Sequence, residues 1–378
     1  MSSSTVPKLF QPIDVGATKL THRVVLAPLT RARAAKEHVP LRPIVKEYYE
    51  QRASTPGTLL ITEATFIAAQ AGGYENIPGI WNEAQISAWK EITDAVHSKG
   101  SFIYLQLWAL GRTASPKDLV AENPDFRLVG ASDIRLSYGK DHAIHPLTTQ
   151  EIQEYIQLYA TAASNAVHQA GFDGVEIHGA NGYLVDQFLQ DVTNNRTDEY
   201  GGSIENRARF GLEVVAAVVK AVGAERTAIR LSPWSTFQEM GMQDPVPTFS
   251  YVATCLAKDY PSFAFIHVVE PRVMGNIDRE TIGEHEQNDF LRKIWAGRPY
   301  IAAGGFVREN AIEQAEKGDK ELIAFGRWFI PNPDLPQRLR NNLKLTPYDR
   351  STFYLSGDAS GRGYSDYKFA EPVDPVAA

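Results

Sequence analysis

The clearest chemical signal in the sequence is a short segment with three hydrogen-bonding side chains. His178, Asn181 and Tyr183 stand together in His-Gly-Ala-Asn-Gly-Tyr. Histidine and asparagine can both donate hydrogen bonds, so the pair could hold a carbonyl oxygen and stabilise negative charge that develops on it. A phenol of high pKa, such as that of Tyr183, is suited to protonating a carbanion. Each residue taken alone could be structural, but their grouping favours a catalytic site.

A second signal indicates a phosphate group. The apolar run Tyr300–Ala303 leads into Gly304-Gly305, and the run Leu322–Phe325 leads into Gly326-Arg327. Glycines let the backbone approach an anion and adopt positive φ, and arginine can grip phosphate oxygens with two hydrogen bonds. Barrel enzymes commonly bind phosphate between the loops that follow strands seven and eight. The alternative is that these are ordinary turn glycines beside a surface arginine.

Arg230 is a charged residue near the end of the apolar run Thr227–Ser232. A guanidinium does not lose its charge in a protein, so its position predicts an anionic partner. That partner is either a bound ligand or, in a buried salt bridge, Glu63 or Glu176. The sequence has no phosphate-binding P-loop and no Gly-x-Gly-x-x-Gly after a strand, which argues against a separate dinucleotide-binding domain.

Eight short apolar runs alternate with longer amphipathic segments along the chain. Each run is almost continuously apolar, which is typical of a parallel strand covered on both faces. With no break in composition, these units predict one (β/α)8 TIM barrel over residues 1–378, with lid-like loops at about 109–146 and 272–286. The predicted strands are Val24–Leu29, Thr58–Glu63, Ser101–Trp108, Asp173–His178, Thr227–Ser232, Phe263–Val269, Tyr300–Ala303 and Leu322–Phe325. The predicted helices are Arg42–Ala53, Glu83–Lys99, Thr149–Ala170, Ile204–Val222, Ser250–Asp259, Glu286–Trp295, Arg308–Lys317 and Asp334–Asn341.

Composition restricts the class of partner. The chain has 378 residues, is 43% hydrophobic and 22% charged, and carries a formal net charge of −7 without a basic run. These values argue for a globular protein and against nucleic acid or an anionic membrane as partner. No stretch approaches the roughly 20 apolar residues that cross a bilayer, and Met1–Phe10 has no signal-peptide core, so we expect a cytoplasmic location. The single cysteine, Cys255, excludes an intrachain disulfide, and we expect it to be a small buried hydrophobe.

From about Lys8 to Tyr367 the sequence resembles the old yellow enzyme family of FMN-dependent oxidoreductases. Five motifs carry the resemblance, and their combination is highly specific. They are Ala27–Arg31, Gln106–Trp108, Gly174–Leu184, Asp198–Arg207 and Ala324–Arg327.

The resemblance implies bound FMN, NADPH as reductant, and a role for individual residues. Thr30 is similar to the residue that bonds flavin near O4 and N5, Gln106 to the one at the pyrimidine edge, and Arg230 to the cation beside N1. His178 and Asn181 would bind the substrate's carbonyl, and Tyr183 would donate the proton. The implied cofactor-binding residues are Pro28, Leu29, Thr30, Ala64, Gln106, Arg230, Gly304, Gly305, Gly326 and Arg327, and the implied substrate-binding residues are His178, Asn181, Trp108 and Tyr354.

Three departures limit this transfer of roles. Ala64 stands where many members have glycine, and Gly305 stands where some have asparagine. The segment Arg272–Glu286 matches no family pattern, so we expect it to shape substrate choice. The cysteine motif of the relatives that hold an iron–sulfur cluster is absent.

The predicted function is therefore a ping-pong ene-reductase that acts on small α,β-unsaturated aldehydes or ketones, as a monomer or homodimer. A flavin-independent barrel isomerase or lyase acting on a phosphorylated substrate is the alternative. We expect no metal site, because strand one has no His-x-His and His142 and His145 lie in a long loop. No lysine stands at a strand end for Schiff-base chemistry. A non-catalytic scaffold would not need so many polar groups at one end of the strands.

Overall fold

Eight parallel strands close into a barrel in the computed structural model, which describes residues 6–139 and 142–371. The order around the barrel is β3, β4, β6, β9, β10, β11, β14 and β15, and β15 pairs with β3 again. This confirms the predicted TIM barrel. The predicted bounds 1–378 and the predicted lid 109–146 include residues 1–5, 140–141 and 372–378, which lie outside the described part. The strands are β3 (Val24–Leu26), β4 (Leu59–Ile61), β6 (Phe102–Trp108), β9 (Gly174–Gly179), β10 (Thr227–Leu231), β11 (Phe265–Val269), β14 (Tyr300–Ala303) and β15 (Glu321–Phe325).

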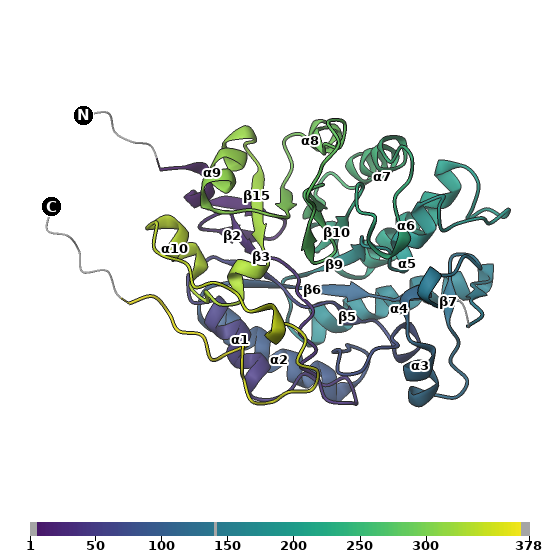
Figure 1. Cartoon of the computed structure of the whole chain (residues 1–378), viewed down its shortest axis with the longest axis horizontal. Coiled ribbons are helices and arrows are strands. Elements are labelled where there is room, and N and C mark those ends of the chain that lie inside the picture. Colours follow the sequence, from purple (N-terminus) through teal and green to yellow (C-terminus); the bar gives the residue numbers. More distant parts are fainter. Residues whose placement is uncertain (1–5, 140–141, 372–378) are drawn as a thin grey trace, which may run out of the picture.

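Helices surround the barrel (Figure 1). Helix α4 begins with a capping box: the Thr148 hydroxyl accepts from the Glu151 N–H, and the Glu151 carboxylate accepts from the Thr148 N–H. The predicted helix Thr149–Ala170 is interrupted, because a π-helical turn follows α4 over Asn165–Gln169. The helices are α1 (Ile44–Arg52), α2 (Glu83–Ser98), α3 (Pro116–Glu122), α4 (Thr149–Ser164), α5 (Leu184–Leu189), α6 (Ile204–Val222), α7 (Val246–Asp259), α8 (Asp289–Ile294), α9 (Arg308–Lys317) and α10 (Leu335–Arg340).

Each barrel strand buries both of its faces, which explains its almost continuous apolar sequence. Val24 and Leu26 pack outward in the layer between strands and helices, whereas Val25 packs inside the barrel. Successive side chains of a strand point to opposite faces, so each barrel strand alternates between residues that point into the barrel and residues that point toward the helices. The strand β3 ends earlier than predicted, since Pro28 has no N–H for the ladder.

A hairpin closes one end of the barrel. Strands β1 (Ile13–Val15) and β2 (Thr18–Leu20) pair antiparallel, and Ile13, Val15 and Leu20 join the apolar cluster inside the barrel. The amino ends of the barrel strands are therefore sealed by packed side chains. The open end is the carboxyl end, where the long loops lie.

The two predicted lids contain regular structure of their own. The first contains α3 and the short strands β7 (Val129–Gly130) and β8 (His145–Pro146), and the second contains a hairpin of β12 (Val273–Met274) and β13 (Ile277–Asp278). Both segments follow barrel strands at the carboxyl end. They are placed to shape access to that end.

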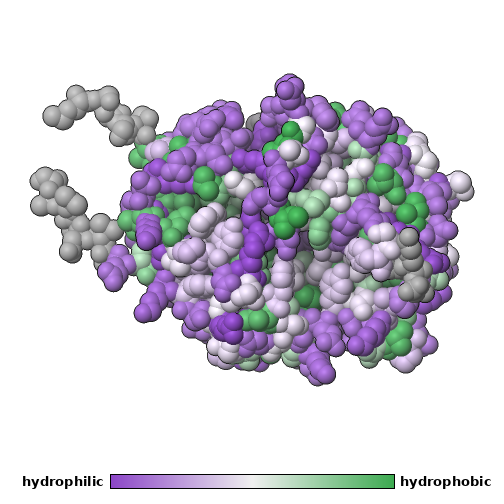
Figure 2. Space-filling model, in the orientation of Figure 1, coloured by the Kyte–Doolittle hydropathy of each residue, from purple (hydrophilic) through white to green (hydrophobic). Residues whose placement is uncertain are grey.

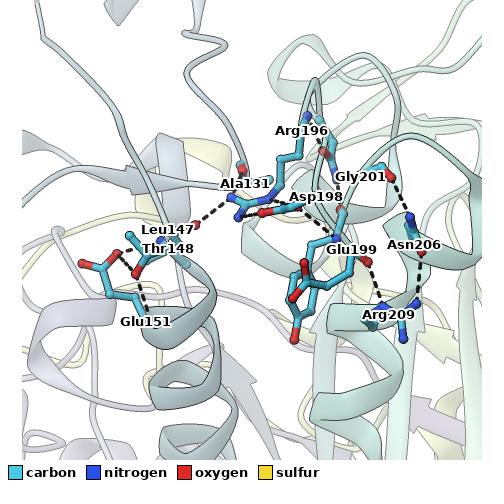
Figure 3. A network of polar contacts seen from close by, with 12 residues as sticks. Ala131, Leu147, Thr148, Glu151, Arg196, Asp198, Glu199, Gly201, Asn206 and Arg209 are labelled. Atoms are coloured by element: carbon cyan, nitrogen blue, oxygen red, sulfur yellow. Dashed lines mark hydrogen bonds and ion pairs between the residues drawn. The ribbon is translucent and has the colours of Figure 1, made fainter.

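A charged side chain fastens the first lid to the loop after β9 (Figure 3). Arg196 donates to the carbonyl oxygens of Ala131, at 2.8 Å, and Leu147, at 2.7 Å, and it forms an ion pair with Asp198 at 2.6 Å. The first residue of the motif Asp198–Arg207, one of the five that carry the family resemblance, thus has a structural role: it pairs with the arginine that connects the two loops.

The surface has two features of note. Hydrophilic residues cover most of the face seen in Figure 2, with hydrophobic residues scattered among them.

Cys255 is half-exposed, so the prediction that it is buried was wrong. It lies on the flank of α7, whose buried face consists of Phe249, Val252, Ala253 and Leu256. No helix in the described ranges is both long and apolar enough to cross a membrane.

Candidate active site

One cavity of about 990 Å³ opens at the carboxyl ends of the strands. Every residue that the sequence predicted for cofactor or substrate lines it. Arg327, Arg230 and His178, which come from three different strands, therefore face one shared space. The predicted residues in its wall are Pro28, Leu29, Thr30, Ala64, Gln106, Trp108, His178, Asn181, Tyr183, Arg230, Gly304, Gly305, Gly326, Arg327 and Tyr354.

Strand register brings a layer of polar side chains together inside the barrel. Arg230 of β10 lies beside His178 of β9 and beside His267 of β11. Gln106 of β6 lies beside Glu176 of β9. All five side chains point into the barrel, because the residues on either side of them along each strand pack in the layer between strands and helices. A polar layer therefore lies at the floor of the cavity.

Glu176 is satisfied by neighbours other than Arg230. Its Oε1 accepts from Gln106 Nε2 at 2.7 Å, and its Oε2 lies 2.8 Å from His267 Nδ1. Both Glu176 and His267 are buried completely. The bond from Gln106 also fixes the orientation of that amide, so its carbonyl oxygen is left for another donor.

The cation at Arg230 has no acid in contact among the described residues. No carboxylate there lies within ion-pair distance of it, and its buried Nε has no hydrogen-bond partner. Burial lowers the pKa of Arg230, and the nearby charge of Glu176 opposes that shift. Glu63 is engaged elsewhere. Neither alternative salt bridge forms, which leaves an anionic ligand as the partner that would satisfy Arg230.

His178 is held as a neutral hydrogen-bond donor. Burial lowers its pKa well below the ordinary value, and the charges of Arg230 and His267 lower it further. Its Nδ1 accepts a long hydrogen bond, 3.4 Å, from the N–H of Ala180. The proton is therefore on Nε2, and Nε2–H can donate to a ligand oxygen.

Asn181 stands in a left-handed turn beside His178. Its φ is 58°, and its N–H donates to the Ser232 hydroxyl at 2.8 Å. The side-chain Oδ1 is buried and has no partner in the described part of the chain. The amide thus needs a ligand to complete its hydrogen bonds.

Tyr183 packs edge-on against two rings of the same wall. Its ring centre lies 4.8 Å from that of Trp108 and 4.9 Å from that of His178. Burial raises the pKa of Tyr183, and the neighbouring Tyr74 raises it further. The phenol therefore keeps its proton until a strongly basic atom, such as a carbanion, is next to it.

The predicted phosphate end is built from backbone turns. Gly304 and Gly305 have φ of +118° and +64°, and a Cβ on Gly304 would lie 2.7 Å from Val273 Cγ2. Gly326 differs from expectation, because its φ is −97°. Its lack of a side chain instead allows the close approach of Leu29, whose Cδ2 would be 3.0 Å from a Cβ.

Arg327 already has a carboxylate partner on the second lid. Its Nη1 lies 2.8 Å from Asp278 Oδ2, and its Nη2 contacts the other oxygen of Asp278. The ion pair raises the pKa of Arg327. A second cation, Arg272, lines the same end of the cavity and lies 4.4 Å above the ring of Phe306. The phosphate end thus holds a second arginine that the sequence had not predicted, together with a carboxylate that already pairs with the first.

The turn that contains Thr30 is supported by a buried carboxylate. Glu63 Oε2 accepts from the N–H groups of Arg31 and Ala32, both at 3.2 Å. Burial raises the pKa of Glu63 to about 7, although these hydrogen bonds and the charge of Arg31 oppose the shift. The side chain of Arg31 in turn donates to the carbonyl of Phe353 at 3.0 Å. Hydrogen bonds through Glu63 and Arg31 therefore connect the turn that contains Thr30 with the C-terminal segment.

Tyr354 lies on that C-terminal segment at the rim of the cavity. It is 54% exposed, and its hydroxyl accepts from Asn276 Nδ2 at 3.2 Å. Asn276 belongs to the hairpin of the second lid. The C-terminal segment and the second lid therefore meet across the mouth.

Sequence reasoning missed several supporting residues. Glu176 and Glu63 were considered only as partners of Arg230, and His267 and Arg272 were not considered. The alternation of inward and outward residues along β9 and β11 could have indicated Glu176 and His267. Nothing local in the sequence marks Arg272.

The residues present fit FMN. The cavity offers an arginine, Arg230, whose buried Nε has no partner in the part of the chain that the structure describes, together with backbone turns beside Arg327 and inward-facing polar side chains. Within residues 6–139 and 142–371, no group of three or more His, Cys, Asp or Glu side chains is arranged to hold a metal ion. The barrel and this cavity therefore belong to the class of proteins that could hold a flavin at the carboxyl ends of the strands.

Comparison with known proteins gives the family. The model of the NADH:flavin oxidoreductase / NADH oxidase family matches residues 8–346. The chain belongs to this family, in its old yellow enzyme branch, and is a flavin-dependent oxidoreductase. Membership also argues against a flavin-independent isomerase or lyase.

Three similar proteins illustrate the range of relatives. The chanoclavine-I aldehyde reductase fgaOx3 of Penicillium roqueforti (strain FM164) is 53% identical over 366 residues, 96% of each chain. A protein of Claviceps purpurea (strain 20.1) named "Probable inactive dehydrogenase easA" is 47% identical over 370 residues, 96% of this chain and 95% of the relative. The crystal structure of Old Yellow Enzyme from Pichia sp. AKU4542 has a TM-score of 0.88 and 40% identity, covering 98% of this chain and 96% of that one.

Proposed function

We propose that the protein is an FMN-dependent ene-reductase. It would use NADPH to reduce the activated carbon–carbon double bond of an α,β-unsaturated aldehyde or ketone in a ping-pong cycle. The observation that carries the proposal is that His178, Asn181 and Tyr183 share one cavity with Arg230 and Arg327. A donor pair for a carbonyl and a proton donor for carbon thus face the same space as the cations for an anionic cofactor.

Residues of the chain would hold the cofactor at its phosphate and at the polar edge of its flavin ring. Arg230 and the amide of Gln106 would bind the flavin ring, and Pro28, Leu29, Thr30 and Ala64 of the same cavity would also contact the cofactor. The turns at Gly304-Gly305 and Gly326-Arg327 would bind the phosphate. Bound FMN supplies the redox chemistry, since it can take a hydride from NADPH and pass it to the β-carbon of the substrate.

The remaining steps belong to side chains of the wall. Nε2–H of His178 and the amide of Asn181 would hold the carbonyl oxygen and stabilise the enolate that forms as hydride arrives. Tyr183 would then protonate the α-carbon, and water would return a proton to the phenol. Trp108 and Tyr354 would enclose the substrate, Trp108 beside Tyr183 and Tyr354 at the rim.

Relatives of this chain carry names that imply either an active or an inactive enzyme. One similar protein is named as an aldehyde reductase and another as probably inactive. We infer an active enzyme from the complete set of donors in this cavity, and an enal or enone as substrate from their chemistry. The aldehyde in the name of the first relative is a substrate to include in any screen.

The test is a screen of enones and enals with the purified holoprotein, with NADPH and NADH in parallel. We expect flavin absorption, NADPH oxidation that depends on the enone, and a product that keeps its carbonyl group and has lost the double bond. Product structure by NMR is the decisive measurement. An allylic alcohol as product, or no turnover with any activated alkene, would contradict the proposal.

A further inference from the structure

A glutamine from a neighbouring loop contacts the turn that carries the predicted proton donor. Gln238 lies in the loop after β10, and its Nε2 donates to the carbonyl oxygen of Asn181 at 3.0 Å. Its side-chain amide also lies close enough to the hydroxyl of Tyr183 to lower the pKa of that phenol. One side chain therefore holds the carbonyl of Asn181 and lies beside the predicted proton donor.

The backbone at Gln238 has an uncommon conformation. Gln238 has φ 59° and ψ 37°, and the next residue, Glu239, has φ 58°. Non-glycine residues adopt this region infrequently, and two in succession imply that the surroundings hold them there. Strained backbone of this kind is found preferentially at functional sites.

A buried arginine from the first lid holds the strained turn. Arg112 Nη2 donates to the carbonyl oxygen of Gln238 at 2.7 Å and to that of Glu239 at 3.4 Å. The N–H of Arg112 donates to Gln187 Oε1 at 3.1 Å, and Gln187 Nε2 donates to the carbonyl oxygen of Gly182 at 2.8 Å. The two carbonyls that precede Tyr183, those of Asn181 and Gly182, are thus each bound by a glutamine amide. A closed circuit of contacts surrounds the turn.

Gln238 has one further property that a packing residue would not need. Its Oε1 is buried and has no hydrogen-bond partner among the described residues. An unpaired buried amide oxygen destabilises the folded protein, so the amide is kept in this orientation at a loss of stability. The orientation directs an N–H of Gln238 to the carbonyl oxygen of Asn181.

We propose that Gln238 is a positioning residue for proton delivery, which donates to the phenol oxygen of Tyr183 and holds the peptide of Asn181 in place. The inference rests on the proposed ene-reductase function. When Tyr183 gives its proton to the α-carbon, negative charge develops on the phenol oxygen, and the Gln238 N–H stabilises it until water returns a proton. Arg112 acts one step further away, because it holds the turn from which Gln238 reaches Tyr183.

The test compares half-reactions of Gln238→Leu, which has a similar size and no hydrogen-bonding group. We expect oxidation of the reduced holoenzyme by an enone to slow about 10- to 100-fold, the effect of one hydrogen bond to a charged group. Reduction by NADPH should change less than about twofold, since no proton leaves Tyr183 in that step. Oxidation by ferricyanide, which takes electrons and needs no proton on carbon, should also be retained.

Two further variants separate positioning from folding. Gln238→Glu should be slower than Gln238→Leu at neutral pH, because a carboxylate repels the phenolate, and it should recover at acidic pH as the carboxyl regains a proton to donate. Glu239→Gln, in the same strained turn but bonded to Ser137, is the matched control and should behave as wild type.

Failure of the role of Gln238 and failure of the proposed function would give different results. Equal losses with the enone and with ferricyanide, or wild-type rates in Gln238→Leu, would overturn the role of Gln238. Wild-type protein that binds FMN and is reduced by NADPH, yet never reduces an enone, would instead overturn the proposed function.

Discussion

The two ends of the cavity are built in different ways. At the proposed phosphate end, backbone turns at Gly304-Gly305 and Gly326 line the cavity, and Arg327 pairs with Asp278 on a partly exposed hairpin. At the proposed carbonyl end, side chains line the cavity, and buried hydrogen bonds fix the turn that carries Asn181 and Tyr183. With the proposed roles, the comparison teaches that an anion site can be built from the main chain, whereas a proton-transfer site needs side chains with supported orientations.

The largest effect is expected at the carbonyl end, for Tyr183→Phe. Loss of the phenolic proton should slow oxidation of the reduced enzyme by an enone about 10²- to 10⁴-fold, the range for loss of a general acid. Reduction of the flavin by NADPH should remain close to wild type. Stopped-flow absorbance of the two half-reactions gives both rates, and equal losses in both would show that Tyr183 is not the donor.

A smaller effect is expected at the phosphate end, for Arg327→Gln. We expect the affinity of the apoprotein for FMN to fall about 10- to 100-fold, because a charged hydrogen bond to phosphate is lost. Affinity for riboflavin, which lacks the phosphate, should be unchanged. Fluorescence titration measures both.

A nearby arginine provides the control for that comparison. Arg350 donates to the carbonyl of Asn276 and does not line the cavity. Arg350→Gln should therefore bind FMN as wild type does. If riboflavin and FMN affinities fell together in Arg327→Gln, the phosphate would not be bound at this end.

The smallest effect concerns a supporting carboxylate away from the reacting atoms, and it is measured in stability. The pKa of Glu63 is raised by burial from its ordinary value to about 7. The folded protein thus binds this proton more tightly than the unfolded chain does, so stability is highest in acid and is lost as pH rises toward 7. The slope is at most about 1.4 kcal/mol per pH unit.

Glu63→Gln should remove this dependence. The amide oxygen can still accept from Arg31 and Ala32, so the melting temperature of the variant relative to wild type should increase between pH 5 and pH 7 and then level off. Asp186, with a pKa also raised to about 7 by burial, leaves a residual slope in both proteins. A constant difference across this range would show that Glu63 is ionised throughout, and thermal melts at four pH values suffice to decide.

The local pattern of residues determined much of this protein. Apolar runs with strand length and β-branched residues predicted all eight barrel strands, because a strand buried on both faces must be apolar throughout. A charged residue inside such a run, Arg230, and polar residues directly after another, His178 and Asn181, stood out for the same reason. Their positions at strand ends placed them at one end of the barrel.

Tertiary structure decided which of these groups are partners. That Glu176 bonds Gln106 and His267, and leaves Arg230 without an acid, follows from the register of strands far apart in sequence. Gln238 reaches the carbonyl of Asn181 from the loop after β10, in a strained turn that Arg112 holds. Side-chain contacts between loops depend on how the whole chain closes, so no local pattern encodes them; the periodicity of a strand depends only on its own two faces, which is why the sequence alone could specify it.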